Sequence, residues 1–291
     1  GLISPRSVVR SHFPLPLKMN KIFKSFKTSP KYSIKWSNYF DIYEDLFQKF
    51  LKKKITIVEV GIGDGGSLFM WKNFFGKYAK IIGIELNPKA KNLERKGFKI
   101  FNGDQSNPNF WKNFYKKIGK IDILIDDGGH TNLQQITTLV ESIKFIKPGG
   151  MIIIEDTHTS FMRDKGFKNP SKFSFINFTT LLIENIHRRN PMLKKEINFF
   201  SRKIQSIEYY DSIVVINISK NKLTKSKNLE NNAKLRNLFD DFRYKKEKNI
   251  NNYKEENFFI NYIKQTVSKR SYLYRIYENS VIKKYIKQLK D

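Results

Sequence analysis

Short apolar runs recur along the first two thirds of the chain, and each is followed by a longer amphipathic stretch. The runs that predict buried strands are Ile55–Val60, Ile81–Ile84, Phe98–Phe101, the run beginning at Ile121, and Met151–Ile154. Nearly uninterrupted apolar residues are typical of strands that are buried on both faces of a parallel sheet. The alternation of these strands with helices predicts an α/β fold with a doubly wound, mostly parallel sheet.

The amphipathic stretches carry their apolar residues at helical spacing. After Trp36 such positions recur every three or four residues, at Phe40, Tyr43, Phe47 and Phe50. This pattern predicts a helix. Tyr39 and Tyr43 could reach a bound ligand, but for Tyr43 a position in the core is the interpretation that we favour. Further helices are expected near Ser67, from about Pro108, after His130, and over Phe175–His187.

The stretch from Ile121 to His130 is the strongest candidate for a functional site. Its strand ends in Asp126 and Asp127, and His130 follows two glycines later. Thr131-Asn132-Leu133-Gln134 then has the residues of a capping box, which starts a helix immediately. The apolar face of that helix is expected at Leu133, Ile136, Val140 and Ile143.

A second acidic cluster follows the strand Met151–Ile154, where Glu155, Asp156 and His158 occur. Lys147-Pro148-Gly149-Gly150 precedes this strand and is expected to stop a helix and turn. Carboxyl ends of parallel strands meet at one sheet edge, where ligands bind in open α/β folds. The alternative is that these acids only solvate strand ends and interact with a helix dipole. We favour a ligand site shared by the two clusters.

A glycine-rich turn with Gly61, Gly63 and Gly65 follows the first strand. Glycines allow a sharp turn and a close approach of backbone to a ligand, and the next helix directs its first N–H groups there. Tight strand-to-helix turns without a ligand use the same residues. Glu85 at the end of the second strand favours the ligand, because an acid there can accept both hydroxyls of a ribose.

The end of the sheet and the flanking segments complete the expected organisation. Ile204–Tyr209 and Ile213–Ile218 predict a closing antiparallel hairpin. Residues 1–18 are richer in proline and nearly free of lysine, so we expect a disordered leader. A helical segment over 19–54, an α/β domain over 55–220 and a basic helical extension over 221–291 follow.

The net charge of +28 favours partners such as nucleic acid, an anionic membrane or phosphorylated small molecules. Lys, Asn, Ile and Phe are enriched together, however, which AT-rich codon usage explains equally well. The absence of cysteine excludes disulfides and thiolate metal sites. No apolar run approaches the ~20 residues that cross a bilayer, and we expect a cytoplasmic protein.

The extension has apolar stripes at helical spacing, and in its last helix lysines accompany the stripe of Ile282, Tyr285, Ile286 and Leu289. A basic amphipathic helix can lie on an anionic membrane. Packing of these stripes on their own domain, or on a second subunit in a homo-oligomer, is the interpretation that we favour.

Together these motifs resemble class I S-adenosylmethionine (SAM)-dependent methyltransferases. The residues that carry the resemblance are Val58-Glu59-Val60-Gly61-x-Gly63-x-Gly65, Glu85, Gly103-Asp104 and Pro148-Gly149-Gly150, within about Trp36 to Ser219. The resemblance implies a Rossmann-like methyltransferase sheet. It places the methionine end of the cofactor at Gly61, Gly63 and Gly65, with its ammonium near Glu59. It also assigns the ribose to Glu85 and the adenine edge to Asp104, with Gln105 or Ser106 adjacent. Asp126 is expected to contact the cofactor or to hold its loop.

DDGGH followed by IEDTHTS further resembles metal-dependent sugar O-methyltransferases of the macrocin and mycinamicin type, a group with rhamnosyl methyltransferase and cephalosporin-hydroxylase-like members. The resemblance implies Mg²⁺ coordination by Asp127, Glu155 and Asp156, with His130 as general base. Gly129 stands where that group usually has serine. Carboxylates and substrate hydroxyls supply the oxygen ligands that a hard cation prefers.

We therefore expect a Mg²⁺-assisted O-methyltransferase acting on a sugar hydroxyl, with a nucleotide-activated sugar for capsule or surface polysaccharide as substrate. Arg163 and Lys165 could receive its phosphates, and His158 could orient it; solvated loop residues are the alternative. Methylation of RNA or of another small molecule, and a non-catalytic SAM-binding module, remain alternatives. We do not expect a nucleic-acid partner, because such surfaces usually interleave aromatic residues with the bases.

Overall fold

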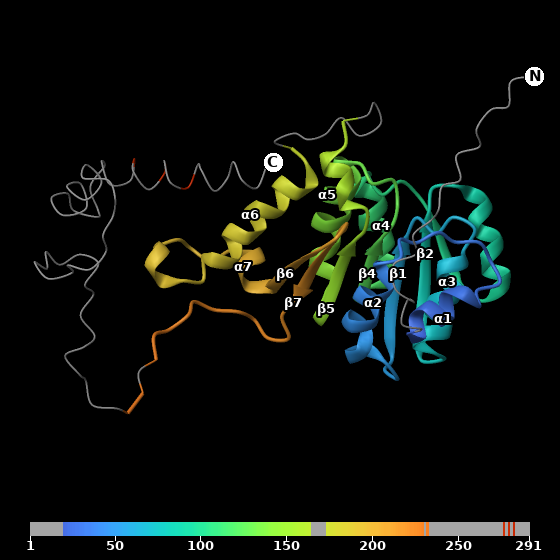
Figure 1. Ribbon diagram of the computed structural model, residues 1–291, viewed down its shortest axis with the longest axis horizontal. Helices are drawn as coiled ribbons and strands as arrows, with labels where there is room; N and C mark the ends of the chain where they lie inside the picture. Colours follow the sequence, from blue (N-terminus) through green and yellow to red (C-terminus); the bar gives the residue numbers. More distant parts are fainter. Residues whose placement is uncertain are drawn as a thin grey trace, which may run out of the picture. The chain divides into compact units, whose positions relative to one another are not determined.

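The computed structural model describes residues 20–163, 173–229 and 231–232, together with Ile276, Asn279 and Ile282 (Figure 1). The chain divides into two compact units, Gly1–Lys227 and Asn228–Asp291. The predicted leader and most of the basic extension lie outside the described residues, and so do the membrane and subunit contacts expected of that extension. Within that described part, no helix is long and apolar enough to cross a membrane.

The described part of the first unit contains a seven-stranded sheet with the order β3-β2-β1-β4-β5-β7-β6. Its strands are β1 (Ile55–Val60), β2 (Ala79–Glu85), β3 (Lys99–Asn102), β4 (Ile121–Asp126), β5 (Ile146–Ile154), β6 (Ile204–Tyr210) and β7 (Ile213–Ile218). The first five are parallel, whereas β7 pairs antiparallel with both β5 and β6. The chain order reverses between β1 and β4, and such a switch point opens a crevice at the carboxyl ends of the strands.

Helices accompany the sheet on both faces (Figure 1). The α-helices are α1 (Lys21–Lys27), α2 (Tyr39–Phe47), α3 (Gly66–Phe75), α4 (Pro108–Ile118), α5 (Asn132–Ser142), α6 (Phe175–His187) and α7 (Phe199–Lys203). The 3-10 helices are η1 (Gln48–Phe50), η2 (Pro88–Lys96), η3 (Ile143–Phe145), η4 (Thr157–Phe161) and η5 (Pro191–Leu193).

Each face of the sheet has its own hydrophobic core, because neighbouring strand residues point to opposite faces. Ile57 of β1 packs in a core with residues of α1, α2 and α3, including Tyr43 and Trp71. Val58, the next residue, packs in a second core with residues of α4, α5 and α6, such as Trp111. Burial on both faces explains why the central strands are apolar almost without interruption.

The predicted fold class is confirmed, and the structure differs from the sequence expectation at two places. Leu133 was expected on the apolar face of α5, but it is 64% exposed. Residues 147–150 were expected to form a turn, but they belong to β5, where Ile146 pairs with Ile121 and Met151 with Ile123. The three extra residues on the β5 side form an irregularity like a bulge, so the strand continues through this segment.

The turn after β1 contacts the loop after β4 so closely that only glycine fits at Gly61. This residue has φ +80°, and a Cβ there would lie 2.0 Å from the carbonyl oxygen of Asp127. Gly63 also has a positive φ, +48°, but a Cβ there would have no atom within 4 Å.

We therefore expect Gly61→Ala to lower the free energy of unfolding by about 3 kcal/mol, through backbone strain and displacement of the Asp127 loop. Gly63→Ala is the matched control and should cost only about 1 kcal/mol, from its backbone conformation alone. Urea denaturation of the two variants measures the difference, and equal losses would contradict the close approach.

Candidate functional site

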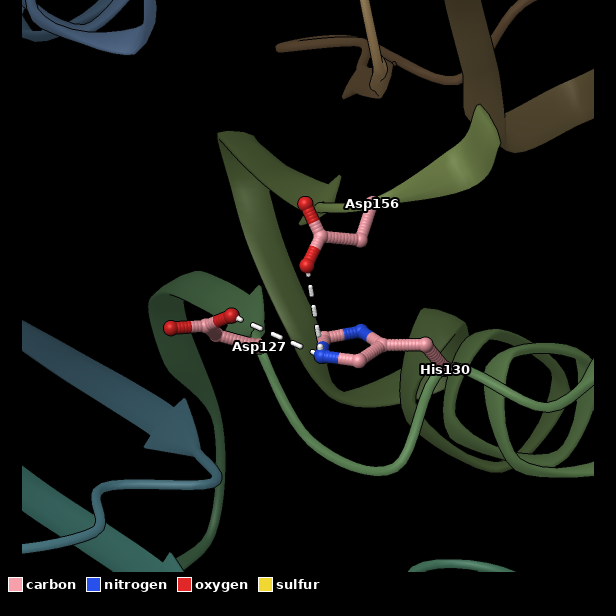
Figure 2. Close-up of side chains that lie close together, drawn as sticks. All are labelled: Asp127, His130 and Asp156. Atoms are coloured by element: carbon pink, nitrogen blue, oxygen red, sulfur yellow. Dashed lines mark ion pairs between the residues drawn. The ribbon is translucent and has the colours of Figure 1, made fainter. Parts of the chain in front are cut away.

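The two acidic clusters converge at the carboxyl edge of the sheet. Strands β4 and β5 are adjacent and in register, so Asp126 pairs with Ile154. Asp127 and Asp156, which follow these strands, point toward the imidazole of His130 (Figure 2). The Nε2 atom of His130 lies 3.8 Å from Asp127 Oδ1 and 3.4 Å from Asp156 Oδ2. The structure therefore brings Asp156 of the second acidic cluster to Asp127 and His130 of the first.

His130 and Asp156 have left-handed backbone conformations, with φ of +56° and +53°. Such conformations are uncommon for residues other than glycine and persist where the surroundings impose them. The capping box of Thr131 and Gln134 is formed and fixes the chain just after His130. The hydroxyl of Thr159 also donates to the carbonyl of His130, at 2.9 Å. The peptide unit between His130 and Thr131 is thus held at its carbonyl group and at its N–H group.

Aromatic residues at the start of α2 hold Asp156. Its Oδ1 atom accepts hydrogen bonds from the hydroxyl of Tyr39 at 2.6 Å and from Nε1 of Trp36 at 3.0 Å. Its backbone N–H donates to the same Tyr39 hydroxyl, at 3.1 Å. Burial and the bond to Asp156 raise the pKa of Tyr39, so its hydroxyl remains a donor. These bonds use one carboxylate oxygen of Asp156 and leave Oδ2 toward His130.

Glu155 has a different environment from Asp156. Its carboxylate is buried and accepts from Lys35 Nζ at 2.8 and 2.9 Å, and Tyr43 donates its hydroxyl to Oε1. The same ammonium lies 2.6 Å from Asp127 Oδ2 and 3.7 Å from Glu59 Oε1. Burial disfavours the charged amine, but the carboxylates outweigh it and raise the pKa of Lys35 well above its usual value. Lys35 therefore stays protonated.

Several residues predicted to bind the cofactor line one cavity of about 320 Å³ beside this cluster, a size within the usual range of ligand pockets. These are Gly61, Gly63, Glu85, Asp104 and Gln105. Glu85 accepts from the backbone N–H of Gly63 at 3.0 Å, so its carboxylate is held at the glycine turn. Glu59, Gly65, Ser106 and Asp126 are not part of this lining.

Those four residues contact, or are next to, elements that carry the lining residues. Glu59 is buried and accepts from Ser67 at 2.6 Å, and Gly65 is the N-cap residue of α3. Ser106 donates its backbone N–H and its hydroxyl to Asp104, at 2.8 and 2.7 Å. Asp126 is fully buried.

Asp126 and Gln105 brace the loop that carries Asp127. The side-chain amide of Gln105 donates to both carboxylate oxygens of Asp126, at 2.9 and 3.0 Å. Asp126 also accepts from the N–H of Gly128, and Gln105 Oε1 accepts from the N–H of Gly129. Of the two roles expected for Asp126, the contacts favour holding the loop.

The donor atoms of Asp127, His130 and Asp156 all lie within 4.8 Å of one another, a spacing that suits a divalent ion. Glu155 is outside this set, and its predicted role as a ligand stays a prediction. His158 lies in η4 with Nδ1 4.0 Å from Asp156 Oδ1, and its ring meets Trp36 edge to face. Arg163 is exposed, and Lys165 lies outside the described residues.

The residues that the sequence analysis missed all precede β1. Lys35 and Trp36 contact the acidic cluster. Tyr39 and Tyr43 were considered only as contacts to the cofactor, with a core position favoured for Tyr43, and they donate instead to Asp156 and Glu155. The helical pattern indicated that this segment packs on the domain. Nothing in the sequence distinguishes Lys35 among the 55 lysines and arginines of the chain.

No family profile matches the chain. Over 165 residues it is 30% identical to the 8-demethyl-8-α-L-rhamnosyl tetracenomycin-C 2′-O-methyltransferase of Streptomyces olivaceus, covering 53% of this chain and 43% of that protein. It is 27% identical over 191 residues to the mycinamicin VI 2″-O-methyltransferase of Micromonospora griseorubida, covering 62% and 47%. The chain thus spans less than half the length of these curated relatives.

Among solved structures, the sheet superposes on the MycE methyltransferase of the mycinamycin pathway, in complex with Mg, SAH and mycinamycin VI. The TM-score is 0.60 at 24% identity, covering 68% of this chain and 52% of that one. The resemblance drawn from the motifs is therefore confirmed: this chain has a methyltransferase fold, and its curated relatives are sugar O-methyltransferases of the macrocin and mycinamicin type.

Proposed function

We propose that this protein is a SAM-dependent, Mg²⁺-assisted O-methyltransferase that methylates a sugar hydroxyl. The observation that carries the proposal is the convergence of Asp127 and Asp156 on Nε2 of His130, beside a cavity lined by the glycine turn. The activities of the curated relatives, which are O-methyltransferases for glycosylated small molecules, agree with it.

The hydrogen-bond acceptors that line the cavity match the donor groups of the cofactor. Glu85 can accept the ribose hydroxyls and Asp104 the adenine amine, since both carboxylates line the cavity. Glu59 Oε1 is buried without a hydrogen-bond partner and has Lys35 Nζ 3.7 Å away, so it can still accept a hydrogen bond from the ammonium group of the cofactor. When bound, S-adenosylmethionine carries its methyl group on a sulfonium sulfur, so orientation and deprotonation of the acceptor are the remaining tasks.

The acidic cluster fits a divalent ion. Asp127 Oδ1 and Asp156 Oδ2 both face Nε2 of His130, and both side chains are about one-fifth exposed. When bound, Mg²⁺ would lower the pKa of a sugar hydroxyl, as it does for water. Asp127 and Asp156 would hold the ion, and the resemblance adds Glu155 as a third ligand.

His130 is placed to take the hydroxyl proton. Its Nε2 atom lies beside the two acids proposed to hold the ion, so a sugar hydroxyl bound at the ion would be within its reach. Its left-handed backbone and the hydrogen bond from Thr159 to its carbonyl hold the residue at the end of the loop.

We expect His130→Ala to reduce methyl transfer at least about a hundredfold, because the general base is lost. Binding of S-adenosylhomocysteine, measured by calorimetry, should stay unchanged. His187→Ala, at the exposed end of α6, is the matched control and should keep full activity. Activity retained in His130→Ala would refute the assignment of the base.

For the acceptor we infer a nucleotide-activated sugar used for surface polysaccharide. The support is the exposed guanidinium of Arg163, which follows η4 at the same edge, together with the basic net charge. His158, next to Asp156, would orient the sugar, and Lys165 would add a second cation.

A panel of nucleotide-activated sugars and of glycosides, read by mass spectrometry, tests the activity. We expect methylation of a nucleotide-activated sugar that EDTA abolishes and that Mg²⁺ restores. Methylation that persists in EDTA would contradict the role of the metal. Transfer to glycosides alone would agree with sugar O-methylation but would contradict a nucleotide-activated sugar as the acceptor.

The contribution of Arg163 is tested separately. Arg163→Ala should raise the KM for the nucleotide-activated sugar about tenfold, since a charge-assisted bond to phosphate is lost. Its kcat should change little. Arg202→Ala in α7 is the control, and an equal KM in Arg163→Ala and the wild type would exclude this phosphate contact.

A further inference from the structure

An exposed tryptophan lies beside the acidic cluster. Trp36 is 57% exposed, whereas the other two tryptophans of the chain, Trp71 and Trp111, are fully buried. Single exposed apolar side chains are ordinary on protein surfaces, so exposure alone decides nothing. Trp36 differs from an ordinary surface residue because its ring is held in place at the candidate site.

Contacts with neighbouring residues hold Trp36 in one orientation. Its Nε1 atom donates to Asp156 Oδ1 at 3.0 Å, and its ring is perpendicular to that of His158, with the centroids 6.1 Å apart. Its carbonyl accepts from the N–H of Tyr39 at 3.1 Å, and the side chain of the preceding Lys35 is buried. Nε1 is the only polar atom of the side chain, so the rest of the exposed ring is carbon.

This carbon surface matches one face of a pyranose. A sugar ring carries hydroxyls around its rim and C–H groups on its faces. The face of an aromatic ring is negative and attracts the weakly positive C–H groups, and the contact also buries apolar surface. Because the indole of Trp36 is already oriented, a sugar that stacks on it does not have to order the side chain.

The position of the ring favours the sugar over the nucleotide part of the acceptor. Trp36 contacts Asp156, and Asp156 Oδ2 lies 3.4 Å from Nε2 of His130. The hydroxyl to be methylated is attached to a carbon of the pyranose, so the pyranose is the part of the acceptor nearest to these groups. The nucleotide begins only beyond the anomeric oxygen.

We propose that Trp36 is an acceptor-binding residue on which the C–H face of the sugar stacks. The stacking places the sugar hydroxyl beside Asp127 and Asp156, within reach of His130. This inference rests on the proposed function and adds a chemical class to it: the acceptor is a pyranose with one face free of axial hydroxyls.

Two substitutions separate the ring of Trp36 from its hydrogen bond. Both Trp36→Phe and Trp36→Ala lose the N–H donor to Asp156, but only Trp36→Ala loses the aromatic ring. We expect the KM for the acceptor sugar to rise about tenfold in Trp36→Ala and at most about threefold in Trp36→Phe. The KM for S-adenosylmethionine should stay unchanged in both. Tyr78→Ala, which removes a 51% exposed ring between α3 and β2, is the matched control and should keep both KM values.

The fluorescence of Trp36 gives a second measurement, made on the wild type with Mg²⁺ and S-adenosylhomocysteine. Since Trp71 and Trp111 are buried, acrylamide should quench mainly Trp36, and Trp36→Phe should lose most of this quenching. The probe is the sugar that the substrate panel shows to be methylated. Its nucleoside diphosphate, or the aglycone of a glycoside, is the control. We expect the sugar to protect Trp36 from acrylamide and the control compound not to protect it.

The results that would overturn the stacking differ from those that would overturn the reaction. Equal KM values in Trp36→Phe and Trp36→Ala, or equal protection by the control compound, would refute the stacking and leave the reaction standing. Weak quenching of the free wild type would also refute it, because another part of the protein or a second copy would then cover the ring. If no sugar of the panel is methylated, the proposed function fails and this inference fails with it. Should Trp36→Ala not fold, the quenching experiment decides by itself.

Discussion

Four carboxylates share a small volume at the carboxyl edge of the sheet, and a buried ammonium makes that arrangement tolerable. Without Lys35, Glu59 and Glu155 would be buried charges with no cation beside them. Isolated buried charges are too costly to persist, so they would take up protons or the segment would rearrange. The geometry of Asp127 and of the neighbouring backbone therefore depends on an ion pair that reaches from the connection between α1 and α2 across the ends of β1, β4 and β5.

This dependence makes the segment before β1 part of the site. Helix α2 packs through Tyr43 and Phe47 on Trp71 of α3, which fixes its position on the sheet. The hydroxyls of its tyrosines then reach the acids that follow β5, while their rings remain in the core. Tyr39 and Tyr43 thus combine packing with hydrogen bonding, a use that suits an amphipathic aromatic side chain. Core stability and site geometry are coupled through the same residues.

The cofactor side and the metal side of the proposed centre meet at one loop. Asp126 and Gln105 hold residues 127–129 from within, and the close contact with Gly61 limits the loop from the side of β1. Asp127 lines the proposed cofactor cavity and also belongs to the candidate metal cluster, so a change at either one would shift it. The parallel register of β1, β4 and β5 provides this meeting point, because it brings their carboxyl ends to one edge.

The sequence by itself determined the features that depend on neighbouring residues. The apolar runs predicted the central strands, the Thr131–Gln134 capping box predicted the start of α5, and the acids after β4 and β5 predicted a shared edge. The partners of those acids were decided only by the tertiary structure. Lys35 meets Asp127 and Glu155 across 92 and 120 positions of the chain, and no local periodicity encodes such a contact. Packing of α2 against α3 brings Lys35 into the cluster.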